Sequence, residues 1–408
     1  MFFAVAGFLW LLMLSGKGNR LVPAEFRRSS PRILAASIVV VVFGAMSSFR
    51  SWDPPGSIGA VMRLGYLTMV WFWMLRCLSV NRRAVAAFIS AWRWGVLVTS
   101  AAVILAYAGM FSLGVPNAEE RQTGWFGHPN DLGGFLAVAV PLFLLGAPTA
   151  VTQRRRTQGA WRAVLLGVVI FGMSTSGSMS AFLAAAAGGA TSGLVLALTR
   201  SGDRRRRRLH PLKAMALVIV GMIALLLLAS TDSPVVERFT RYGEGDAYIE
   251  SSVGDRGTAN ERVINNLDDA LVIGNGFDRL GQADLDLDLG VHNMYLKLLY
   301  EGGLITASAL VLILVVCLQQ AWRLLRNTRS TLLHRDIAAV MGSAVAAIVF
   351  SNFQPTSIQR FFWIPFAMIQ CYWTLRRSEI ASGQTEDELN AWSAPPAAAA
   401  ARSAIRPS

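Results

Sequence analysis

The chain has 408 residues, of which 53% are apolar and 15% are charged, with a formal net charge of +13 and a mean hydropathy of +0.44. Soluble domains carry about a quarter charged residues, so this deficit excludes a soluble globular protein, a disordered chain or a disulfide scaffold as a description of the whole. The positive charge would favour nucleic acid only if it were gathered on one exposed face. It is divided among the connections between apolar segments, so we expect no nucleic-acid partner.

Apolar segments of membrane-spanning length recur along the chain. A helix needs roughly 20 residues to cross a bilayer, with about 17 to 25 tolerated. The candidate spans are residues 2–15, 33–49, 58–76, 84–110, 130–149, 161–175, 179–199, 213–230, 294–322, 336–352 and 361–375. They predict an all-α, polytopic transmembrane bundle of about 11 spans, or 12 if a helix precedes the short first one. The lipid bilayer is therefore an expected partner, and Gly189 and Gly193 predict a close helix contact within it.

The basic residues predict the orientation of these spans. Of the 38 Lys and Arg residues, 25 lie in alternate connections, which the positive-inside rule assigns to the cytoplasm. The N-terminus is then outside and the C-terminus inside. The predicted divisions are residues 1–231 with spans one to eight, an acidic extracytoplasmic loop at 232–292, residues 293–378 with the last three spans, and a disordered cytoplasmic tail at 379–408.

Three polar clusters lie on the predicted outer side. The first precedes the fifth span and contains Arg121, Gly124, Gly127, His128, Pro129, Asn130 and Asp131. Asn130 or Asp131 can cap the helix, and an arginine beside a helix N-terminus favours an anion. The alternative is a plain helix cap with a solvated arginine.

The second cluster lies in the large loop. Arg256 and Arg262 precede a segment with apolar residues at helical spacing, which could lie on the membrane surface or pack across the mouth of the bundle. Gly274 and Gly276 follow and mark a turn. A lone Gly-x-Gly does not indicate a nucleotide site.

The third cluster begins where the loop returns to the membrane, with His292 as a candidate base or hydrogen-bond donor. Asn293, Lys297 and Glu301 are four residues apart and predict one polar helical stripe. Lys297 and Glu301 could bind a ligand directly or simply satisfy each other. Arg63, near the outer end of the third span, could face the same cavity.

The sequence indicates no metal site and no cofactor. Cys77, Cys317 and Cys371 lie in or beside apolar runs and lack the Cys/His spacing of a zinc site. Segment 284–288 is rich in aspartate, but the glycine and the glutamate that a calcium-binding loop requires are not at the corresponding positions.

Together the three clusters resemble the motifs of the O-antigen ligase and polymerase family of polytopic bacterial membrane proteins. The first cluster is similar to that family's Arg, Gly and Pro-Asn pattern before a span. Arg256 with the downstream glycines resembles its loop arginine and Gly-x-Gly, with Arg262 as the competing arginine. The His292-Asn293 pair with Tyr295 and Glu301-Gly302 resembles its motif at the return to the membrane. Met179 stands where many relatives have the arginine of a Ser-Arg pair, which argues against ligand binding by the turn at residues 174–180.

The resemblance implies a metal-independent glycosyltransferase that polymerises or ligates saccharide units at the outer face of the cytoplasmic (inner) membrane. The donor would be a polyprenyl-diphosphate-linked glycan, and the acceptor a hydroxyl of a glycan, lipid or protein. Arg121 and Arg256 would stabilise the diphosphate leaving group and His292 would act on the acceptor hydroxyl. The expected substrate-binding residues are Asn130, Arg262, Asn293, Lys297, Glu301 and Arg63.

Two other functions fit parts of the sequence. A transporter or flippase of a lipid-linked glycan or small anion would explain ionisable residues within spans, but it predicts internal repeats and discontinuous helices near the midplane. No repeat is found, and the polar groups cluster at the outer mouth. A scaffold in an envelope assembly would use the acidic loop as a docking surface.

Overall fold

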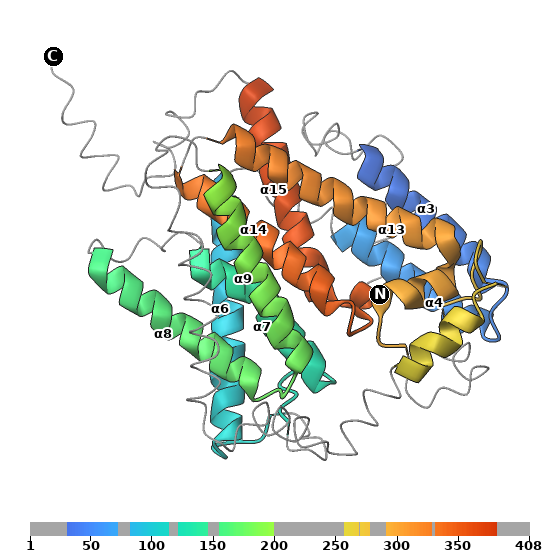
Figure 1. Ribbon diagram of the computed structural model, residues 1–408, viewed down its shortest axis with the longest axis horizontal. Coiled ribbons are helices and arrows are strands. Elements are labelled where there is room, and N and C mark those ends of the chain that lie inside the picture. Colours follow the sequence, from blue (N-terminus) through green and yellow to red (C-terminus); the bar gives the residue numbers. More distant parts are fainter. Residues whose placement is uncertain are drawn as a thin grey trace.

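The computed structural model describes residues 31–71, 82–113, 121–145, 155–199, 257–268, 270–277, 291–328 and 331–381. All regular secondary structure within these ranges is helical, and Figure 1 shows how the helices cross one another. A further short helix covers residues 257–265. The principal elements are α3 (Pro31–Ser48), α4 (Pro54–Gly65), the π-helix η2 (Tyr66–Trp71), α6 (Arg82–Tyr107), α7 (Pro129–Leu145), α8 (Arg155–Ser174), α9 (Met179–Thr199), α13 (Met294–Asn327), α14 (Thr331–Phe350), the 3-10 helix η4 (Thr356–Ile358) and α15 (Arg360–Ala381). The predicted all-α class is confirmed for this part of the chain.

Several helices are long and apolar enough to cross a membrane. Among the described residues there are 5 such segments, namely Pro31–Ser48, Ala84–Tyr107, Met179–Thr199, Met294–Asn327 and Leu333–Phe350. Pro129–Leu145 and Trp161–Ser174 are shorter apolar helices. The predicted spans at 2–15 and 213–230 lie outside the described residues, and the others coincide with helices. The protein is therefore a multi-pass membrane protein.

Two predicted spans are not continuous α-helices. Within the range predicted for the third, α4 gives way at Tyr66 to the π-helix η2. The ninth, predicted at 294–322, corresponds to α13, which is interrupted at Gly303, where φ is 73° and ψ is 175°. Such a backbone conformation is accessible to glycine but breaks the helical hydrogen-bond ladder. Hydropathy reports only the apolar content of a segment, so it does not detect these changes of helix type.

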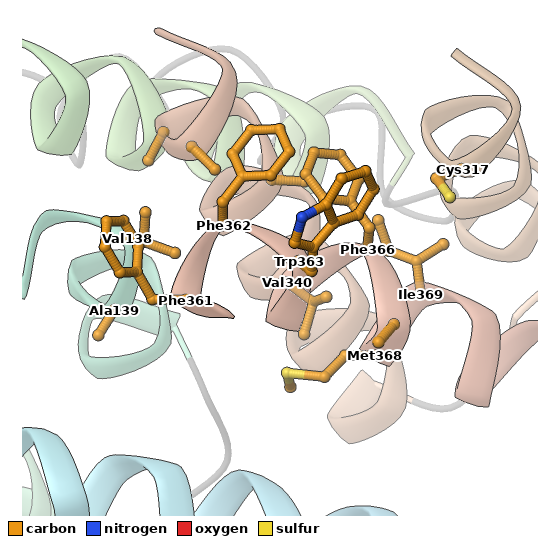
Figure 2. Close-up of a cluster of buried hydrophobic side chains, with 14 of the residues drawn as sticks. Val138, Ala139, Cys317, Val340, Phe361, Phe362, Trp363, Phe366, Met368 and Ile369 are labelled. Carbon is orange, nitrogen blue, oxygen red and sulfur yellow. The ribbon is translucent and has the colours of Figure 1, made fainter. Parts of the chain in front are cut away.

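The centre of the bundle is an aromatic cluster on α15. Phe362, Trp363 and Phe366 lie close together (Figure 2) and are fully buried. Phe350 of α14 is fully buried as well. The rings of Phe362 and Trp363 are perpendicular, with centroids 5.1 Å apart, a favourable edge-to-face arrangement. Trp363 also donates its indole N–H to the carbonyl of Ser357 at 2.8 Å. The cluster thus fixes both α15 and the turn that precedes it.

Close contact between α9 and α14 depends on small residues. A Cβ on Gly188 would lie 2.6 Å from the Gly342 carbonyl oxygen, and Ser192 donates to the Ala338 carbonyl at 3.1 Å. A Cβ on Gly193 would meet nothing within 4 Å. The expectation that Gly193 would take part in the close contact is therefore wrong, because that glycine faces open space. The contact uses Gly188, one helical turn before Ser192, and its partner Gly342.

Candidate functional site

Arg121 is buried in the loop before α7, beside the first turn of that helix. The residue is only 5% exposed. Its Nε donates to the carbonyl of Ser176 at 2.7 Å, and its Nη2 donates to Oδ1 of Asn130 at 2.6 Å. The structure therefore brings Arg121 and Asn130 together. It excludes the alternative of a solvated arginine beside a helix cap.

The turn between α8 and α9 forms the other wall of the Arg121 site. The backbone N–H of Gln122 donates to the Thr175 carbonyl at 3.0 Å. Gly177 has a φ of 61°, and a Cβ there would lie 3.0 Å from Arg121 Nε. A residue with a side chain would therefore be strained and would crowd the guanidinium. Although Met179 replaces the arginine expected from the family resemblance, the turn contacts the site through its backbone.

The first turn of α7 is capped differently from the expectation. The ring nitrogen Nδ1 of His128 accepts from the backbone N–H of Asn130 at 3.1 Å. The side chain of Asn130 binds Arg121, and Oδ2 of Asp131 accepts from Nε2 of Gln359 at 3.1 Å. The expected cap by Asn130 or Asp131 is therefore replaced by His128. This frees both side chains for contacts with other segments.

The segment at 291–295 meets the end of α14. Asn293 caps α13, accepting from the N–H groups of Tyr295 and Leu296 at 2.9 and 3.1 Å. The N–H of Met294 donates to the Ser351 carbonyl at 2.9 Å, and the Tyr295 hydroxyl donates to the Ile348 carbonyl at 3.1 Å. His292 precedes this anchored turn and is half-buried, with Nδ1 shielded from solvent.

The turn at residues 351–359 connects the first and third clusters. One end contacts Met294 through Ser351 and Thr356, and the other reaches Asp131 through Gln359. Gln354 lies between them, and its Nε2 is buried without a hydrogen-bond partner among the described residues. A buried amide without a partner indicates a place for water or a ligand group. The sequence did not point to these residues because amides and hydroxyls in a turn form no recognisable pattern.

Glycines in the loop and in α13 allow the two backbones to approach each other closely. Gly274 has a φ of 86°, and a Cβ there would lie 2.3 Å from the carbonyl oxygen of Glu301. The N–H of Gly276 donates to that same carbonyl at 2.9 Å. At the break in α13, a Cβ on Gly303 would lie 2.3 Å from the Val272 carbonyl oxygen. The turn expected at Gly274 and Gly276 is confirmed, and its role here is to fit against the interrupted helix.

Within the expected polar stripe, Lys297 and Glu301 form an ion pair with an Nζ to Oε1 distance of 3.3 Å. Glu301 is buried, whereas Lys297 is half-buried. Asn293 uses its side chain for the helix cap. The stripe is thus largely engaged in holding the first part of α13.

Arg63 and Arg262 are exposed, and Arg256 lies outside the described residues. No group of three His, Cys, Asp or Glu side chains that could hold a metal is found within the described ranges. The site is therefore built around one buried arginine, a half-buried histidine, an ion pair and several amide groups.

Comparison with models of known protein families finds no match to this chain, and a search of curated proteins finds none. The membrane-length helices of the chain pack around an aromatic core, and polar connections meet at one end of the bundle. The chain is identified as a helical, multi-pass membrane protein.

Proposed function

We propose that the protein is a metal-independent glycosyltransferase of the O-antigen ligase and polymerase type. It would transfer a glycan from a polyprenyl diphosphate carrier to a hydroxyl of a glycan, lipid or protein acceptor. Its place would be the cytoplasmic membrane, in cell-surface or exopolysaccharide assembly.

The observation that most supports this proposal is the link between the first and third motifs. Arg121 is held by Asn130, the neighbouring Asp131 binds Gln359, and the same turn binds Met294 beside His292. These segments are far apart in sequence, so no local folding requirement brings them together. Gln354 adds a buried N–H donor in the connecting turn, suited to a sugar hydroxyl or a phosphate oxygen.

The chemistry assigns a different task to each charged group. In the transfer, the bond between the anomeric carbon and the diphosphate oxygen breaks while a bond from the acceptor oxygen to that carbon forms. Arg121, at the positive N-terminal end of α7, and Arg256 would stabilise the negative charge that develops on the leaving diphosphate. His292 would take the proton of the acceptor hydroxyl and later release it to solvent. Asn130, Asn293, Lys297, Glu301, Arg262 and Arg63 would contact the substrates or hold the groups that do.

The proposed arrangement in the membrane has about 11 spans, with the site on the extracytoplasmic side. Two of these spans, at 2–15 and 213–230, are proposed from hydropathy alone. Residues 232–292 would form the outer loop between the eighth and ninth spans, and residues 379–408 the cytoplasmic tail. In the described part of the chain, alternate connections lie at the same end of the bundle. This supports the arrangement, because consecutive spans that cross a membrane in opposite directions place every second connection on the same side.

Single substitutions at Arg121, Arg256 and His292 test the proposal. Each is replaced by Ala in cells that make the glycan, and polymer or ligated product is measured together with the amount of protein in the membrane. Loss of one interaction made in the transition state typically lowers a rate by about 10²–10³-fold. We therefore expect the amount of product per unit of protein in the membrane to fall to background in each variant.

Arg326→Ala is the matched control. Arg326 is an exposed arginine in the last turn of α13, at the end remote from the site. Its replacement should leave product formation unchanged. Normal product from all three site variants would refute the assignment.

A transporter of a lipid-linked glycan or small anion is the second candidate. The interruption of α13 at Gly303 and the π-helix η2 favour it, because discontinuous helices often form transporter binding sites. The polar groups nevertheless lie near the connections at one end of the bundle, which fits transfer at a membrane surface better. A transporter would move the lipid-linked glycan or anion intact and release no carrier diphosphate.

A further inference from the structure

The loop segment at residues 271–273, which we call the elbow, is attached to α13 where that helix is interrupted. The N–H of Leu304 donates to the carbonyl of Leu271 at 2.7 Å. Gly303 approaches the carbonyl of Val272 so closely that a Cβ would clash with it. The elbow is therefore held in place by the backbone of the helix.

Although it is apolar, the elbow is exposed. Val272 is 58% exposed and Leu271 is exposed as well. Directly beside them, Leu304 begins an exposed stripe that continues along α13 through Val311, Leu312 and Val315, at spacings that place these residues on one helical face. Because α13 is a membrane-length apolar helix, this stripe is suited to contact with acyl chains. The elbow extends the stripe beyond the interruption.

A neighbouring turn indicates the depth of the elbow in the bilayer. Phe49 and Trp52 are highly exposed on the connection between α3 and α4, with Trp52 at 75%. The loop is joined to this turn, because Gly276 packs against Ser51 and Phe277 donates its N–H to Ser57 at 2.6 Å. Exposed aromatic residues at the ends of spans are typical of the boundary between head groups and acyl chains.

The short helix at 257–265 buries Ala259 and Val263 against the protein, whereas Ile264 is 56% exposed. Val263 and Leu267, the latter just beyond the helix, pack with Tyr300 and Leu296 of α13 in a small apolar cluster. Its exposed side carries Glu261, Arg262 and Asn265. The sequence left two alternatives for this segment, on the membrane surface or packed across the mouth of the bundle. In the structure the helix packs against the protein.

We infer that the elbow is a membrane anchor that inserts Leu271 and Val272 into the acyl-chain boundary of the adjacent leaflet. It would hold the acidic loop at a fixed height above the bilayer surface. Burial of apolar side chains in lipid provides the favourable free energy. This inference does not depend on the proposed chemistry.

Spin labelling of the full-length protein in vesicles tests the anchor. Leu271→Cys and Val272→Cys are compared with Asn265→Cys and Asp268→Cys, which are also exposed but polar. Cys77 is replaced by Ser in the background, while Cys317 and Cys371 are buried and should resist the reagent. We expect the ratio of oxygen to nickel-chelate collision rates to be several-fold higher at residues 271 and 272 than at the two controls.

Either of two results would overturn the inference. High nickel-chelate accessibility at residues 271 and 272 would place the elbow in water. Low accessibility to both oxygen and nickel would mean that another protein segment, or a second copy of the chain, covers it.

Discussion

Arg121, in the loop before α7, joins the first turn of that helix to the α8–α9 turn, which is distant in sequence. The sequence predicted Arg121 and Asn130 as parts of one site because both lie beside the same helix start. It did not predict the bond to Ser176, because a backbone carbonyl has no residue signature. It also missed Gln354 and Gln359, which the fold alone brings beside the two motifs. The sequence thus predicted the charged groups of the site, whereas their uncharged partners became visible only in the structure.

Replacing Arg121 by Lys should destabilise the protein even though the charge is retained. A lysine cannot donate from Nε and Nη2 to two separate acceptors, so the Ser176 carbonyl or the Asn130 amide would lose its partner. We expect a loss of about 1.5–3 kcal/mol, measured by reversible unfolding in mixed micelles. Arg63→Lys, at an exposed position, is the control and should change stability by less than about 0.5 kcal/mol. Equal stability of the two variants would mean that Arg121 is not buried and clamped.

A double-mutant cycle resolves whether Lys297 and Glu301 hold each other or bind substrate. The variants are Lys297→Met, Glu301→Gln and the pair. If the ion pair is structural, Lys297→Met alone leaves a buried carboxylate without its cation, and the double variant should recover part of the loss. We expect a coupling of about 1–3 kcal/mol in unfolding free energy. Negligible coupling combined with loss of activity in each single variant would favour direct substrate contacts instead.

The apolar pattern of the sequence predicted the positions of the helices well, but it did not predict where they are interrupted. Hydropathy predicted the ranges of α3 and α9 closely because their composition is uniform, whereas α14 begins five residues before its predicted span, with His334 and Arg335 in its first turns. The interruption of α13 is set by a tertiary contact, in which residues 271–276 occupy the space beside Gly303. The same limitation applies between α9 and α14, where the sequence offered several glycines and only packing selects Gly188.

Gly303→Ala should strongly destabilise the protein. The new Cβ would sit at a positive φ and collide with the Val272 carbonyl oxygen. Left-handed backbone strain and overpacking together predict a loss of about 2–5 kcal/mol. The matched control is Gly193→Ala on α9, where the added methyl meets open space and helix propensity predicts a gain of up to about 1 kcal/mol. Similar unfolding curves for the two variants would contradict an interruption at Gly303.

The whole bundle separates its connections into two groups. At one end lie the turns bearing Arg121, Ser176 and Gln359. At the other, Arg93 donates to the Leu142 carbonyl at 2.6 Å, and Thr199 lies 2.5 Å from His334, measured between Oγ1 and Nε2. These contacts lie at helix ends that adjoin arginine-rich stretches of the sequence, because Leu142 is near the end of α7, Thr199 ends α9 and His334 is near the start of α14. The alternation of basic residues in the sequence therefore matches the alternation of helix ends in the fold.

Cysteine labelling tests which side of the membrane each end faces. Trp52→Cys and Trp125→Cys, on two exposed turns of the site end, should react with a membrane-impermeant maleimide added to intact cells. Arg326→Cys, at the other end, should react only after permeabilisation. Opposite behaviour of the residue 52 and residue 125 variants would contradict their placement at one end. Reversal of all three would keep the fold and overturn the proposed orientation.

The most direct test of the proposed function is a reconstitution of the purified protein in vesicles with a polyprenyl-diphosphate-linked glycan and an acceptor saccharide. Released polyprenyl diphosphate and elongated or ligated glycan are both measured, with Arg121→Ala and His292→Ala as inactive variants and Arg326→Ala as the active control. A glycosyltransferase should release carrier and form product in equal amounts, and both should be lost in the two site variants. Movement of the intact lipid-linked glycan across the vesicle membrane, with no carrier diphosphate released, would contradict transfer and establish transport.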